Sequence, residues 1–293
     1  MDQASQLRNI IKAQSMPQRP LARVITVTSG KGGVGKSNTA INLAIQFRKM
    51  NQRVIILDAD FGLANIEIMF GAVPKHNLYD LIYQGKNIKD IITWGPMDVG
   101  FISGGSGIAG MSNLSREYLV YIIQNLAELD AIADIIIIDT GAGISDAVLE
   151  FLVASGEILL VTTPEPTSIT DSYSLLKELS HHSRFSPEAT QIKVLANKVE
   201  TEEEGKNLYN RLNMVVSRYL KLPIRYLGSI PQDNKLSRAV MQQSPVSLIE
   251  PNALSSLSYE RIANRLMNRE VSDTIPRRGM AAFFSHIISG KKN

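Results

Sequence analysis

The sequence contains no cysteine, no apolar run long enough to cross a membrane, and almost no net charge over most of its length. The lack of cysteine excludes disulfides, iron–sulfur ligation and thiolate zinc sites, and it fits a reducing compartment. No stretch reaches the roughly 18 apolar residues of a spanning helix, and the first residues are polar and acidic, unlike a signal peptide. We therefore expect a cytoplasmic protein.

Charge is concentrated at the C-terminal end. The net charge is +3, yet residues 275–293 contain four basic residues and no acid, so the rest of the chain carries about −1. The sequence pI near 9.0 therefore describes a tail rather than a basic face, and it disfavours a nucleic-acid partner.

Seven short apolar runs rich in β-branched residues recur along the 293 residues, with helical patterns between most of them. The runs are nearly continuous rather than alternating, which is typical of strands buried on both faces of a parallel sheet. The order strand, helix, strand predicts an α/β fold, with a mostly parallel sheet and helices on both faces. The runs are residues 24–28, 54–57, 99–102, 135–138, 158–162, 192–196 and 224–230.

We divide the chain into three parts. Residues 1–20 form an N-terminal arm that ends in a proline-punctuated linker, residues 21–270 form the main domain, and residues 271–293 form a linker and an amphipathic tail. The main domain is expected to hold the chemistry, because ligands of such sheets bind beyond the carboxyl ends of the strands.

The first strand runs into a glycine-rich segment that matches the P-loop pattern Gly-x4-Gly-Lys-Ser. Its glycines let backbone N–H groups converge on phosphates, and the following helix N-terminus adds partial positive charge. Lys36 should reach the β- and γ-phosphates, and the Ser37 hydroxyl should ligate Mg²⁺. The predicted nucleotide-binding residues of this segment are Gly30, Lys31, Gly32, Gly33, Val34, Gly35, Lys36, Ser37 and Asn38.

Three carboxylates follow two other predicted strands. Asp139 ends one of them and is expected to hold Mg²⁺ through water. Asp58 and Asp60 end the other, where one acid can assist the metal while the other orients water. The predicted metal site is thus Ser37, Asp58 and Asp139; the alternative for any single acid is a solvated strand end.

Together these segments resemble the deviant Walker ATPases of the MinD and ParA class, over roughly residues 22–267. The resemblance implies a P-loop NTPase that uses ATP and Mg²⁺ and hydrolyses ATP slowly to ADP and phosphate as an ATP-dependent homodimer. The matching segments are Gly30 to Ser37, Asp58 to Asn65, Asp139 to Gly143 and Thr162 to Pro166.

The resemblance also implies roles for single residues. Lys31 would cross the dimer interface to the partner's phosphates, Asp60 would position the attacking water, and both would act with Lys36 in catalysis. Asn197 would read adenine, and the base pocket would be closed by Pro231, Gln232 and Asp233. GTP is disfavoured because Glu200 stands where a guanine-reading Asn-Lys-x-Asp motif ends in Asp.

Several members of the class do not fit. Iron-protein and cluster-scaffold relatives need cysteines, and tyrosine-kinase relatives have a tyrosine-rich tail, whereas no tyrosine follows Tyr259. A DNA-partitioning ATPase remains an alternative, as does a nucleotide-binding scaffold without turnover. Retention of Lys31, Lys36 and Asp60 argues against the scaffold.

The C-terminal tail contains one apolar stripe with helical spacing, made of Met280, Phe283, Phe284, Ile287 and Ile288. Basic residues flank it on both sides and suit anionic headgroups. We expect this helix to attach the protein reversibly to the inner face of the cell membrane. The alternative is a helix docked on the protein's own core. The membrane-bound and the docked helix could each belong to a different nucleotide state.

The N-terminal arm matches a short element of one subgroup. Its residues Asp2, Gln3, Ala4, Leu7 and Arg8 match Asp-Gln-Ala-x-x-Leu-Arg at the start of the flagellar-number regulators called FlhG, FleN or YlxH. The resemblance implies that the element activates FlhF, a GTPase related to the signal recognition particle, and that flagellar switch (C-ring) proteins are partners. The alternative is an ordinary disordered start. The resulting prediction is a membrane-associating, ATP-dependent regulator of flagellum placement and number.

Overall fold

The computed structural model describes residues 21–60, 65–104, 125–268 and 279–289. The predicted N-terminal arm lies outside these residues, as do residues 269–278, which contain most of the predicted linker. Within the described parts of the chain, no helix is both long and apolar enough to cross a membrane.

The core is an eight-stranded sheet with the strand order β3-β4-β2-β5-β1-β6-β7-β8. All seven predicted strands are confirmed, with bounds that differ by one to three residues, and they pair in parallel. The pattern does not predict β3, Thr93–Trp94, which pairs antiparallel with β4, because two residues show no periodicity. The other strands are β1 Arg23–Thr28, β2 Val54–Ala59, β4 Gly100–Ser103, β5 Ile135–Thr140, β6 Glu157–Thr162, β7 Gln191–Val199 and β8 Ile224–Pro231.

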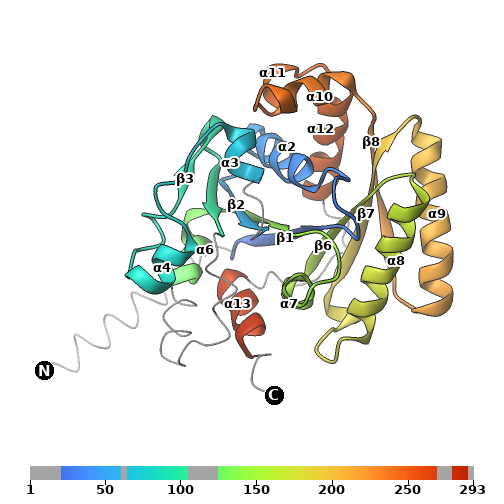
Figure 1. Cartoon of the computed structure of the whole chain (residues 1–293), viewed down its shortest axis with the longest axis horizontal. Helices are drawn as coiled ribbons and strands as arrows, with labels where there is room; N and C mark the ends of the chain where they lie inside the picture. Colours follow the sequence, from blue (N-terminus) through green and yellow to red (C-terminus); the bar gives the residue numbers. More distant parts are fainter. Residues whose placement is uncertain (1–20, 61–64, 105–124, 269–278, 290–293) are drawn as a thin grey trace, which may run out of the picture.

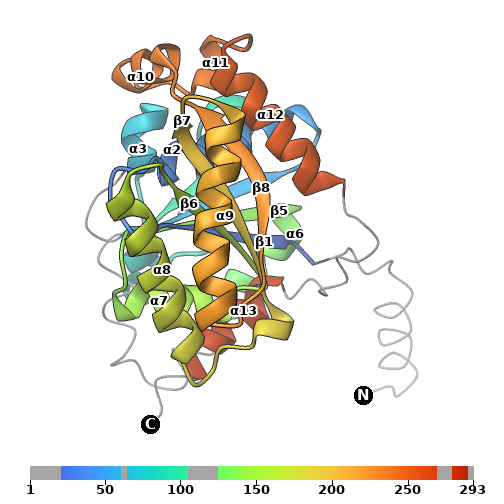
Figure 2. The same cartoon turned by 90° about the vertical axis from the view of Figure 1, so that its right-hand side faces the viewer.

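Helices cover both faces of the sheet, as predicted (Figure 1). One face is covered by α2 Lys36–Lys49, α3 Asn65–Phe70, α10 Asn234–Met241, α11 Val246–Ile249 and α12 Leu254–Met267. The other face is covered by α4 Leu78–Gln84, α6 Leu129–Ile132, α7 Asp146–Ala154, α8 Pro166–His181, α9 Glu202–Tyr219 and α13 Gly279–Ser289. The turned view shows α8 and α9 side by side over the β6–β8 end (Figure 2). Because both faces are covered, the strands are buried on both sides and read as continuous apolar runs.

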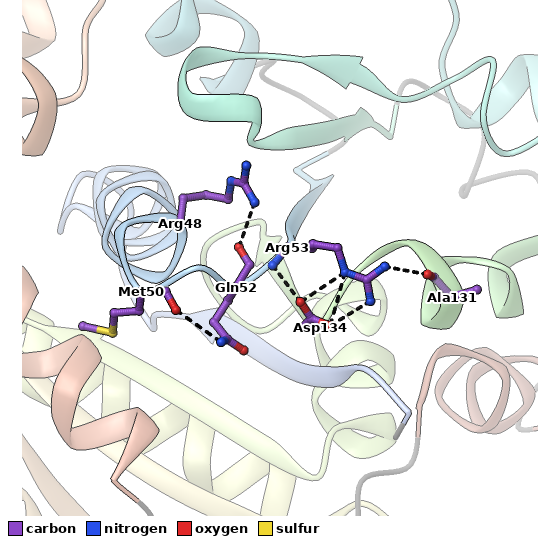
Figure 3. Close-up of polar contacts among 6 residues, drawn as sticks. All are labelled: Arg48, Met50, Gln52, Arg53, Ala131 and Asp134. Carbon is purple, nitrogen blue, oxygen red and sulfur yellow. Dashed lines mark hydrogen bonds and ion pairs between the residues drawn. The ribbon is translucent and has the colours of Figure 1, made fainter. Parts of the chain in front are cut away.

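The start of the central strands is fixed by one ion pair (Figure 3). Asp134, just before β5, accepts hydrogen bonds from the backbone N of Arg53 at 2.8 Å and from its Nη2 at 2.7 Å. Arg53 also donates from Nη1 to the carbonyl of Ala131 at 2.8 Å. These bonds hold β2 and β5 in a register that places Asp58 directly opposite Asp139 at their far ends.

Helix α13 confirms the predicted C-terminal helix, but its apolar stripe packs on the protein's own body. Met280, Phe283, Phe284 and Ile287 are all buried, and both phenylalanine rings lie within 6.5 Å of the Phe151 ring of α7. The alternative of a docked helix is therefore what the structure shows for these four residues, and the side chain of Ile288 lies outside the described ones. A membrane role for this stripe requires α13 to separate from α7.

Candidate nucleotide-binding site

The P-loop lies between the end of β1 and the start of α2, as predicted. Two of its glycines are required by close approaches. A Cβ on Gly30 would lie 2.2 Å from the backbone carbon of Asp171 in α8. Gly35 has φ +98°, and a Cβ there would lie 2.3 Å from the amide nitrogen of Asn197. The loop is therefore pressed against α8 on one side and the end of β7 on the other.

Two side chains at the end of β7 bind backbone carbonyl groups of the P-loop. Asn197 Nδ2 donates to the carbonyl of Val34 at 2.7 Å, and Lys198 Nζ donates to the carbonyl of Gly33 at 2.8 Å. The role of Lys198 was not predicted, because a strand pattern places its side chain on the opposite face from Asn197.

The remaining oxygen of Asn197 fits the predicted base contact. Asn197 is buried, and its Oδ1 has no hydrogen-bond partner among the described residues. One of the two Nδ2 hydrogens is used on Val34, so the side chain still has its unpaired oxygen and one amide hydrogen to offer a base. The unpaired oxygen can accept from the exocyclic amine of adenine, and the preference for adenine over guanine stays a prediction.

The segment after β8 is held in place by Asp233. Its Oδ1 accepts from the backbone N of Lys235 at 2.8 Å and caps α10, while its Oδ2 accepts from the backbone N and hydroxyl of Ser255 in α12. Burial alone raises the pKa of Asp233, but the bonds from Ser255 and Lys235 lower it overall. The carboxylate is thus already engaged, so Asp233 can close a base pocket by fixing Pro231 and Gln232 rather than by touching the base.

The two opposed carboxylates are buried at the centre of the sheet. Burial, followed by the charge of Asp139, raises the pKa of Asp58 to about 8. Burial also raises the pKa of Asp139 to about 6, against the opposing effect of Ser37 and Lys36. A divalent cation would remove this repulsion, because it favours the ionised form of both groups.

Asp139 satisfies a further condition for a cation ligand. Both of its oxygens are buried and neither has a hydrogen-bond partner of normal geometry within the described part of the chain. Unpaired buried carboxylates are costly, and a metal with its bound water would satisfy them. Asp139 therefore fits Mg²⁺, and Ser37 and Asp58 would hold the ion with it, together with phosphate oxygens and water.

Asp60 lies beside the turn that follows β5. Its backbone N donates to Asp58 Oδ1 at 3.1 Å, and its own Oδ1 is 3.8 Å from the position that a Cβ on Gly141 would take. Its charge contributes to the raised pKa of Asp139. This position between the metal ligands and the turn at 140–143 suits the predicted task of orienting a water.

The two P-loop lysines have different surroundings. Lys36 is buried and lies near Asp139. Lys31 is partly exposed, and its Nζ bonds Glu165 at 2.7 Å and Thr167 Oγ1 at 2.8 Å within the same chain. The hydrogen bond from Lys31, followed by its charge, lowers the pKa of Glu165. The predicted reach of Lys31 into a partner stays a prediction, and it requires these two contacts to rearrange.

Comparison with known proteins agrees with this geometry. Residues 25–246 match the CobQ/CobB/MinD/ParA nucleotide binding domain family. The antiactivator FleN of Pseudomonas aeruginosa PAO1 is 38% identical over 244 residues, which cover 83% of this chain and 86% of FleN. The flagellum site-determining protein YlxH of Helicobacter pylori 26695 is 32% identical over 295 residues, covering 98% of each chain.

Among solved structures, the septum site-determining protein MinD from Pyrococcus horikoshii OT3, complexed with Mg-ADP, has the same fold, with a TM-score of 0.66 and 19% identity. The match covers 85% of this chain and 97% of that one. Because the family match spans most of the chain and both flagellar relatives exceed 30% identity over most of their length, the chain belongs to the MinD/ParA nucleotide-binding family, in the group of the flagellar-number regulators FlhG, FleN and YlxH.

Proposed function

We propose that the chain is an ATPase that binds ATP with Mg²⁺ and forms a dimer around it. The observation that supports this most strongly is the arrangement of Lys31 at the exposed rim of a complete P-loop, with Lys36 and the unpaired Asp139 behind it. A lone P-loop of this kind lacks a second cation, and Lys31 of a partner would supply one. Such a cation in trans is worth roughly 10³ to 10⁵ in rate in related phosphoryl transfer.

ATP would control membrane attachment through α13. In the described arrangement the stripe of α13 is buried against α7, and α7 begins at Asp146, three residues after the turn at 140–143 beside Asp60. A γ-phosphate or a partner chain at that turn would shift α7 and weaken the packing of α13 against it. Two released tails on one dimer bind a membrane together, because the second is held at high effective concentration near the surface.

The biological role we propose is the regulation of flagellum placement and number, which the FleN and YlxH relatives support. The arm at residues 1–20 would activate an FlhF-type GTPase, and C-ring proteins would be further partners. A ParA-like DNA-partitioning ATPase is the alternative, and the test below separates the two.

The dimer is tested by chromatographic sizing with and without ATP and Mg²⁺. Wild type should shift to a dimer with ATP, Lys31→Ala should bind ATP but stay monomeric, and Lys36→Gln should lose nucleotide binding. Lys49→Ala is a control, since Lys49 lies at the far end of α2, the helix that begins at Lys36, and bonds the distant carbonyl of Ser247. Equal elution of wild type and Lys31→Ala in ATP would rule out a dimer in which Lys31 of each chain reaches the partner's ATP.

Membrane and DNA roles are tested by co-sedimentation. The ATP-bound protein should pellet with anionic vesicles and stay in solution with an equal mass of linear DNA. The reverse result would establish the partitioning alternative.

A further inference from the structure

The end of β7 departs from regular strand geometry at one residue. Asn197 lies opposite Ile230 of β8 and Val199 lies opposite Pro231, so Lys198 is the extra residue of a bulge. Lys198 has φ +57°, a left-handed conformation that residues with a Cβ rarely adopt. Bulges next to binding sites typically re-aim a side chain.

The bulge brings two adjacent side chains to the same loop. In a regular strand, neighbouring side chains point to opposite faces. Here Asn197 and Lys198 instead donate to the adjacent carbonyl groups of Val34 and Gly33, at 2.7 Å and 2.8 Å. The unusual backbone of Lys198 is therefore what allows both contacts to form.

By binding two carbonyl groups, these contacts also fix the direction of the N–H group in each of the two peptide units. In a trans peptide the C=O and the N–H point in opposite directions, and no cis peptide occurs within the described ranges. The carbonyl of Gly33 shares its peptide group with the N–H of Val34, and the carbonyl of Val34 shares its group with the N–H of Gly35. Holding the two carbonyls toward β7 therefore turns both N–H groups away from β7, toward the inside of the loop where phosphates bind.

We propose that Lys198 is a positioning residue that turns the Val34 N–H toward the bound phosphates and so sets the affinity for nucleoside di- and triphosphates. The proposal rests on the nucleotide binding proposed above. Lys198 is exposed and makes its contact from outside the loop, so it would act through the backbone and not on the γ-phosphate itself. Its charge also helps to keep Glu165, the partner of Lys31, ionised.

The chain offers a matched control. Lys221, in the turn before β8, is also an exposed lysine with positive φ, at +52°, and it has no resolved contact with the P-loop. Lys198→Met and Lys221→Met remove the same ammonium group from the same backbone conformation, so any general effect of the substitution is common to both. Lys198→Arg restores a donor.

The experiment is a calorimetric titration of the full chain with ADP and with a non-hydrolysable ATP analogue, both with Mg²⁺. Lys198→Met should lower the affinity for both nucleotides by a similar factor of about ten, equal to about 1.4 kcal/mol of binding free energy. Lys198→Arg should restore most of the affinity, and Lys221→Met should match wild type. The unfolding midpoint of Lys198→Met without nucleotide should equal that of Lys221→Met.

Three outcomes would overturn the proposal. These are unchanged affinity in Lys198→Met, a loss confined to the triphosphate analogue, which would indicate direct γ-phosphate contact, and a loss that follows a lowered unfolding midpoint without rescue by Lys198→Arg. Wild type that bound neither nucleotide would instead refute the nucleotide-binding function, so the two failures can be told apart.

Discussion

Helix α13 should be released by a substitution on the body of the protein that leaves the tail unchanged. Asp130 of α6 caps the start of α13, because its two oxygens accept from the backbone N of Met280 at 3.0 and 3.1 Å. At the other end, Arg184 donates to the carbonyl of His286 at 2.6 Å and pairs with Glu150 of α7. Asp130→Ala removes the first of these two clamps.

The expected effect is large because docking is nearly balanced. Burial of Met280, Phe283, Phe284 and Ile287 contributes about 8 kcal/mol at about 2 each. The two charged hydrogen bonds add about 1.5–3 kcal/mol each, whereas ordering the 11 residues of the helix costs roughly 11 kcal/mol at about 1 each. Loss of about 2 kcal/mol at Asp130 should therefore raise the ratio of released to docked helix by about 30-fold.

The assay is co-sedimentation with anionic vesicles in the absence of nucleotide. Asp130→Ala should bind more vesicles than wild type, and adding Phe283→Asp should abolish the binding. Gly279→Ala is a second way to release the helix, since Gly279 has φ +66° and a Cβ there would lie 2.6 Å from Asp130 Oδ2. Asp98→Ala is the control, because Asp98 is exposed and pairs only weakly with Arg48, at 3.6 Å.

The outcome that refutes the reasoning is clear. If Asp130→Ala and Gly279→Ala both fold, as judged by thermal unfolding, and both bind vesicles no better than wild type, α13 is a permanent part of the core. If single Phe283→Asp leaves vesicle binding by the ATP-bound protein unchanged, the stripe is not the membrane contact.

Three further predictions concern the site and the arm. Asp60→Ala should keep the ATP-dependent dimer and lose phosphate release in a single-turnover assay, whereas normal release would exclude Asp60 as the residue that orients water. Burial raises the pKa of Asp139 to about 6, so the folded state holds this proton more tightly than the unfolded state, and stability should fall as pH rises from about 4 through 6. Asp139→Asn should thus stabilise the Mg²⁺-free protein at pH 8, by on the order of 3 kcal/mol in urea unfolding, but much less at pH 4, and an equal effect at both would contradict the assignment. A peptide of residues 1–20 should stimulate phosphate release by an FlhF-type GTPase, and Gln3→Ala or Arg8→Ala should reduce that stimulation; equal activity of all three peptides would reject the motif.

Local patterns predict this fold well because its strands are buried on both faces. Seven strands, the P-loop and the acids at Asp58, Asp60 and Asp139 follow from short stretches whose neighbours along the chain define them. The exception is the two-residue β3, which exists because it pairs with β4 and has no pattern of its own.

The roles of Lys198 and Asp233 could not be read from the sequence. Strand alternation places Lys198 away from the P-loop, and only the bulge against β8 turns it around. Asp233 lies in the predicted base-closing segment, but its carboxylate is taken by α10 and α12, contacts that depend on how distant helices pack.

The sequence by itself determines the phosphate loop, the parallel sheet and the family, because each depends on residue types at fixed short spacings. It cannot determine where the stripe of α13 binds, since a lipid interior and a protein core both accept the same apolar face. Only the tertiary structure places that stripe against Phe151 and supplies Asp130 and Arg184 at its ends. The same holds for Lys31, because Glu165 and Thr167 come to it from the start of α8, more than 130 residues further along the chain.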